Sequence, residues 1–131
     1  MGATGAKNFE NDDAADWAYD LAESNGTSLL AEAFGVVEKM DFADAPDCCI
    51  ALAAAEVVAA AKGKPSSDLP DEIRTWLEDQ ENSDGFKKLD KRAAKVAKKV
   101  QAKSELRDLW EESDDWHNWQ MAVEGLLKRL A

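Results

Sequence analysis

The segment that decides the fold is Cys48-Cys-Ile-Ala-Leu-Ala-Ala-Ala-Glu-Val-Val-Ala-Ala-Ala61, in which Glu56 is the one charged residue. Read as a helix, it is apolar around nearly its whole circumference, which is typical of a helix buried on all sides. Its 14 residues are fewer than the roughly 20 that span a bilayer. We therefore predict a central, alanine-rich helix at 46–63 in a soluble, cytoplasmic protein.

The rest of the chain repeats apolar residues at steps of three and four, which indicates helices, and almost nowhere shows the alternation of strands. With 131 residues the chain is long enough to bury a substantial core. We expect an all-α fold, a compact bundle of six or seven helices around the central one, in a single domain, 1–131. The expected helices cover residues 12–23, 28–40, 46–63, 70–80, 86–102, 104–112 and 114–130.

Charge is distributed unevenly along the chain. The chain has 27 acidic and 16 basic side chains, giving a formal net charge of −11. Residues 1–61 hold 2 basic and 12 acidic side chains, whereas residues 86–103 hold 8 basic and 1 acidic. A chain this acidic is a poor general binder of DNA, RNA or anionic lipid.

The basic segment 86–103 has two interpretations. Its apolar residues recur at helical spacing, so it can pack against the core with its lysines in water; it can instead contact nucleic acid, a membrane or an acidic partner. We favour the first interpretation, because lysine lacks the bidentate geometry of arginine and no aromatic residues interleave for base stacking. The stripe predicted to face the core is Phe86, Leu89, Ala93, Val96 and Val100. The cations kept as candidate partner-surface residues are Lys87, Lys88, Lys91, Arg92, Lys95, Lys98 and Lys99.

The segment before the first helix also has two interpretations. Asn11 suits an N-cap, and acidic residues directly after it favour a helix start through the helix dipole. Phe9 and Trp17 on either side offer large apolar areas, so we favour a structural clasp. The alternative is an acidic recognition patch made by Asn11, Asp12, Asp13 and Asp16.

Residues with catalytic or metal-binding chemistry are few. His117 is the single histidine, so it cannot form a multi-histidine metal site, and no Ser or Cys lies at a diagnostic spacing from it. Cys48 and Cys49 are adjacent, which makes a disulfide between them strained, and we expect buried, inert thiols. Glu56 needs a partner if it is buried: either a cation of the basic segment neutralises it or it points to solvent. We assign no catalytic, cofactor-binding or metal-ligating residue.

Three stretches resemble an uncharacterised bacterial family, the domain of unknown function numbered four-two-five-nine. They are the opening Met1-Gly-Ala-Thr-Gly with Phe9-Glu-Asn-Asp-Asp-Ala-Ala-Asp-Trp17, the alanine-rich run 51–61, and Ser104-Glu-Leu-Arg-Asp-Leu-Trp-Glu-Glu-Ser113. The resemblance implies a stand-alone bacterial domain whose segment 9–17 is tied to the body. The family brings no established activity, cofactor or catalytic residue.

The sequence favours a protein–protein interaction module, such as an inhibitor or an immunity-like protein, because charge complementarity would let it bind a basic partner. One alternative is a carboxylate-based hydrolase or a metal-dependent enzyme. Another is nucleic-acid or membrane contact through the basic helix 86–103. We expect the partner to be another protein, with no cofactor, no nucleic acid and no membrane.

Overall fold

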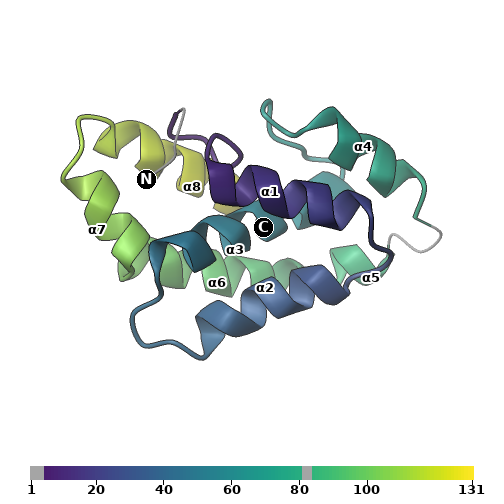
Figure 1. Ribbon diagram of the computed structural model, residues 1–131, viewed down its shortest axis with the longest axis horizontal. Coiled ribbons are helices and arrows are strands. Elements are labelled where there is room, and N and C mark those ends of the chain that lie inside the picture. Colours follow the sequence, from purple (N-terminus) through teal and green to yellow (C-terminus); the bar gives the residue numbers. More distant parts are fainter. Residues whose placement is uncertain (1–4, 81–83) are drawn as a thin grey trace.

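The computed structural model describes residues 5–80 and 84–131 (Figure 1), so residues 1–4, the start of the N-terminal motif, lie outside the described part. Eight helices and no strand occur within these two ranges, which confirms the all-α fold. The helices are α1 (Asp12–Ala22), α2 (Ser28–Glu38), α3 (Ala45–Ala61), α4 (Asp71–Glu78), α5 (Asp84–Lys87), α6 (Asp90–Ala102), α7 (Glu105–Glu111) and α8 (Trp116–Leu130).

Helix α3 is the centre of the bundle, as predicted. Every residue from 51 to 59 is buried, and α3 contacts each of the other helices in the described chain. Alanine side chains add little radius, so neighbours can pack around the whole circumference of α3 at interior density. Figure 1 shows α1 above α3 and α2 below it.

Glycine ends this central helix. Gly63 has a φ of 84°, a left-handed conformation that costs glycine little. The Gly63 amide donates to the Ala60 carbonyl at 2.9 Å and the Lys64 amide donates to the Ala59 carbonyl at 3.0 Å. These two bonds form a Schellman motif, which satisfies carbonyls that the end of a helix would leave free.

The basic segment differs from the prediction in one respect. It does not form a single helix over 86–102, because a turn at residues 88 and 89 separates α5 from α6, and this raises the helix count to eight in the described chain. A residue on each side of the turn contacts another part of the chain. Phe86 packs edge-to-face on Trp76, with ring centroids 5.4 Å apart, and Asp90 Oδ2 accepts a bond from Lys62 Nζ at 3.1 Å.

The predicted apolar stripe of this segment does face the core. Phe86, Ala93, Val96 and Val100 are buried, and Leu89 packs against the core while half-buried. Apolar burial therefore holds α6 in place, and its exposed lysines are not required for docking.

The N-terminal clasp is confirmed. Phe9 and Trp17 are each 8% exposed and belong to the core. The Phe9 amide donates to Asp68 Oδ2 at 3.0 Å, and Lys7 Nζ donates to Ser67 Oγ at 3.2 Å. The segment before α1 is thus fastened to the connection between α3 and α4. Within the described residues, no helix combines the length and the apolar character needed to cross a membrane.

Candidate functional site

The predicted acidic patch has a structural part and an exposed part. Asn11 caps α1, since its Oδ1 accepts a hydrogen bond from the Ala14 amide at 2.8 Å. Asp12 and Asp13 lie in the first turn, where the helix dipole favours them. Asp16 is exposed one turn further along α1.

The predicted set of seven basic residues falls into two groups: two of them bond to α2, and the others face water. Arg92 forms a bidentate pair with Glu38, at 2.9 Å from Nε and 2.7 Å from Nη2, and this bonding lowers the pKa of the Glu38 carboxyl below its ordinary value. Lys99 Nζ donates to the carbonyls of Val37 and Glu38 at 2.9 and 3.2 Å. Both cations thus hold the C-terminus of α2, where helix carbonyls are otherwise unsatisfied.

The remaining cations of that set face water. Lys87 makes a long contact of 3.9 Å with Asp84. The other four are exposed and make no ion pair within the described residues: Lys88, Lys91, Lys95 and Lys98. The sequence analysis grouped seven cations as one candidate surface. In the structure five of them face water, and two, Arg92 and Lys99, are half-buried and bonded to α2.

A groove lies between α1 and α2, with α3 beneath it. Its volume is about 240 Å³. Each of the three helices contributes an apolar and an acidic residue three positions apart. The pairs are Trp17 and Asp20 on α1, Leu29 and Glu32 on α2, and Ile50 and Asp47 on α3, with Ala33 and Val36 of α2 completing the lining.

The carboxylates of this groove make no ion pair with the described cations. Asp20 and Glu32 are exposed and Asp47 is half-buried, and none makes an ion pair in the part of the chain that the structure describes. Asp16, one turn before Asp20 on α1, is also exposed and makes no ion pair within the described residues. The groove therefore combines an apolar floor with an unneutralised acidic rim.

Sequence reasoning missed this groove. Its signal is the repeated spacing of an apolar residue and an acid three positions apart, in three different helices. Such a pair shares one helix face. Each pair alone is typical of any amphipathic helix at the edge of a core. Only the packing of α1 and α2 on α3 brings the three pairs together.

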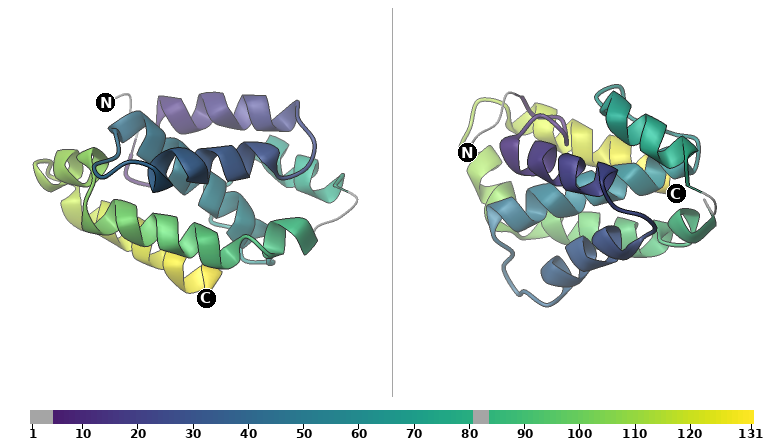
Figure 2. Two further views of the ribbon diagram at one scale, coloured as in Figure 1. Left: turned by 90° about the horizontal axis from the view of Figure 1, so that it is seen from below. Right: turned by 45° about the vertical axis from the view of Figure 1, so that its right-hand side comes forward.

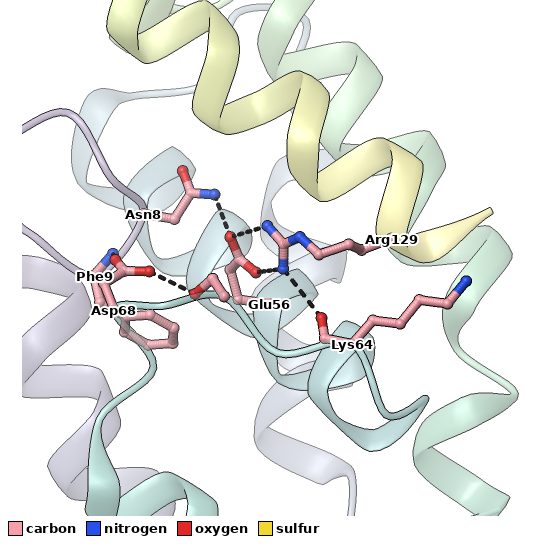
Figure 3. Close-up of polar contacts among 7 residues, drawn as sticks. Asn8, Phe9, Glu56, Lys64, Asp68 and Arg129 are labelled. Carbon is pink, nitrogen blue, oxygen red and sulfur yellow. Dashed lines mark hydrogen bonds and ion pairs between the residues drawn. The ribbon is translucent and has the colours of Figure 1, made fainter.

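A second cluster of charge is buried. Glu56, only 1% exposed, is a buried charged residue of the central helix α3. Arg129 of α8 donates to its carboxylate from Nη1 at 2.6 Å and from Nη2 at 3.1 Å, and Asn8 Nδ2 donates to Oε2 at 2.7 Å. Figure 3 shows Asn8 and Arg129 reaching Glu56 from two sides. Neither alternative for Glu56 was right, because its partner comes from α8 and not from the basic segment, and it does not point to solvent.

This cluster joins three parts of the chain that are distant in sequence. Arg129 Nη1 also lies 3.3 Å from the Lys64 carbonyl. A carboxylate held by a bidentate arginine and an amide has three of its roughly four acceptor sites occupied. The arrangement suits a structural junction between the N-terminal segment, α3 and α8.

The other side chains with potential reactivity are the two cysteines and the histidine. Burial raises the pKa of Cys48 to about 11 and that of Cys49 to about 12, so both are neutral thiols near pH 7, as expected for inert cysteines. His117 is exposed. Within residues 5–80 and 84–131, no three His, Cys, Asp or Glu side chains are grouped so that they could hold a metal ion.

Comparison with known proteins identifies the family. The sequence model described as "Domain of unknown function (DUF4259)" matches residues 2–122, and the chain belongs to this family. No curated protein and no solved structure shows a significant match to the chain.

Proposed function

We propose that this member of a family without an assigned activity is an interaction module that binds a basic protein partner through the side formed by α1, α2 and the start of α3. One observation carries the proposal: the carboxylates of this side are not neutralised by the protein's own cations. They are Asp12, Asp13, Asp16, Asp20, Glu23, Glu32 and Asp47, none of which makes an ion pair within the described residues.

The basic helix α6 is too distant from the outer face of α1 to neutralise the acids there. Figure 2 (left) shows α1 at one side of the molecule and α6 toward the other, with α2 and α3 between them. Helix axes pack about 8–10 Å apart, so the outer faces of α1 and α6 are separated by roughly 20 Å. At physiological ionic strength, charges further apart than about 8 Å are largely screened from each other.

An unneutralised acidic side has a specific consequence for binding. It steers a basic partner toward the surface and repels acidic proteins and nucleic acids, and this effect weakens as salt is added. The bonding of Arg92 and Lys99 to α2 also takes two cations away from any anionic ligand of α6. The charge layout therefore supports a basic protein partner over nucleic acid.

The test measures binding of a fluorescently labelled 15-residue oligolysine by anisotropy, at low and at physiological salt. One variant neutralises four acids of the proposed side: Asp16→Asn, Asp20→Asn, Glu32→Gln and Asp47→Asn. The matched control neutralises four exposed acids in α4 and at its C-cap, namely Asp71→Asn, Glu72→Gln, Glu78→Gln and Asp79→Asn, and so has the same net charge.

We expect the first variant to lose at least tenfold in affinity at low salt and the α4 control to lose less than threefold. Equal losses in the two variants would mean that only net charge matters, and the proposed side would be rejected. Failure of oligolysine to bind the unmodified protein at low salt would reject the proposal outright.

A further inference from the structure

We infer that the groove between α1 and α2 takes an amphipathic basic helix of the partner, whose apolar side chains insert against Val36 while its Lys and Arg residues meet the acidic rim. This inference rests on the proposed function and adds the form of the partner segment. It depends on the shape and the apolar floor of the groove, whereas the proposed function depends on charge alone.

The floor of the groove is apolar surface that the described residues leave partly exposed. Val36 is 37% exposed, whereas Val37, the next residue, is fully buried. Leu29 and Ile50 are half-buried, and both line the groove. Covering such side chains with apolar atoms is favourable by about 25 cal/mol for each Å² removed from water.

The size of the groove favours side chains over a small molecule. Pockets that hold cofactors or drug-sized ligands have volumes of about 300–1,000 Å³. The groove, at about 240 Å³, falls below that range. It is large enough for one or two apolar side chains projecting from a partner.

The layout along α2 matches a helix laid lengthwise. Leu29, Ala33 and Val36 follow one another at i, i+4 and i+7, so they form a line along one face, about 10 Å long at 1.5 Å per residue. A helix bound in a groove presents its anchors at the same spacing. Adding a strand to a sheet edge is the other common way to bind a peptide, and the described residues contain no strand to extend.

The positions of the acids define the charge of that helix. Asp20 stands on the α1 wall, Glu32 on the α2 wall and Asp47 at the start of α3. A helix lying between these walls has carboxylates on both flanks of its apolar stripe. The fitting segment therefore has Lys or Arg on both sides of one row of apolar residues, and an acidic amphipathic helix of the same shape is excluded by like charge.

The experiment compares three labelled peptides by fluorescence anisotropy at physiological and at low salt. The first is an 18-residue Leu/Lys peptide with leucines on one helical face. The second has the same composition in an order that scatters the leucines, and the third is oligolysine. Two single variants accompany the unmodified protein: Val36→Ser removes apolar floor, and Tyr19→Ser removes a side chain that is 69% exposed on α1 but does not line the groove.

We expect the amphipathic peptide to bind at least tenfold more tightly than the scattered one. We expect Val36→Ser to reduce that affinity about tenfold, and to leave oligolysine binding at low salt unchanged. Tyr19→Ser should change neither. Urea unfolding of both variants checks that the fold is intact, and substitutions at exposed positions are expected to cost little stability.

The outcomes separate the two proposals. If the amphipathic and scattered peptides bind equally, or if Val36→Ser leaves the affinity for the amphipathic peptide unchanged, the helix-in-groove inference is wrong while binding by charge stands. If none of the basic peptides binds even at low salt, the proposed function fails and the inference fails with it.

Discussion

Glu56 and Asp20 are both carboxylates on helices that pack against each other, and the protein treats them in opposite ways. Glu56 is 1% exposed and has an arginine and an amide bonded to it. Asp20 is exposed and has no ion-pair partner among the described residues. A buried carboxylate without a partner is costly, whereas an exposed one is solvated by water. The contrast shows that the buried carboxylate has a cation bonded to it, whereas the exposed acids of the α1–α2 side are solvated by water and make no ion pair within the described residues.

The largest effect is expected from breaking the buried pair. Arg129→Met leaves the Glu56 carboxylate buried without its main partner, so we expect the free energy of unfolding to fall by about 3–5 kcal/mol. The measurement is urea unfolding followed by circular dichroism. The double variant Glu56→Met with Arg129→Met should recover most of the loss, because no unpaired charge remains. A loss below about 1 kcal/mol in the single variant would mean that the pair behaves like a surface ion pair.

A smaller, pH-dependent effect is expected at Glu38, whose exposure and bonding are intermediate between those of Glu56 and Asp20. The hydrogen bond from Arg92 lowers the pKa of Glu38 in the folded protein below its value in the unfolded chain. The pair therefore adds stability above the ordinary glutamate pKa, about 4.3, and this contribution disappears as the pH falls through the lower folded value. The side chains are 37% and 38% exposed, so the contribution is under about 1 kcal/mol.

The measurement compares the unfolding free energy of the unmodified protein and of Glu38→Gln between pH 7 and pH 3. The difference between the two should be greatest at neutral pH and should shrink toward the acid end. A difference that grows as the pH falls would have the wrong sign and would contradict the role given to Arg92.

The smallest effect on stability is expected in the groove. Asp20→Asn with Glu32→Gln removes two exposed charges that make no ion pair within the described residues, so the unfolding free energy should stay within about 0.5 kcal/mol of the unmodified value. Thermal and urea unfolding check this expectation. A loss above about 1 kcal/mol would show that these acids support the fold, and it would remove the contrast with Glu56.

Local sequence was sufficient to predict most of the helices, but it predicted few of the contacts between them. The cap at Asn11, the apolar stripe of α6 and the burial of α3 were predictable, because each depends on residue spacing within one segment. The turn that separates α5 from α6 was not predictable in this way. It depends on Trp76 and Lys62, which approach from other parts of the chain.

The candidate site shows the same limit. Helical periodicity states which face of a helix is apolar, and composition states that 1–61 is acidic and 86–103 is basic. Neither periodicity nor composition predicts which cation forms an ion pair with which carboxylate. Arg92 bonds Glu38 and Arg129 bonds Glu56 across 54 and 73 residues of sequence. Only the packing of the helices around α3 brings these partners within bonding distance, and the same packing leaves Asp20, Glu32 and Asp47 around an open apolar floor, because electrostatic and apolar contacts depend on distance in space and not on position in the chain.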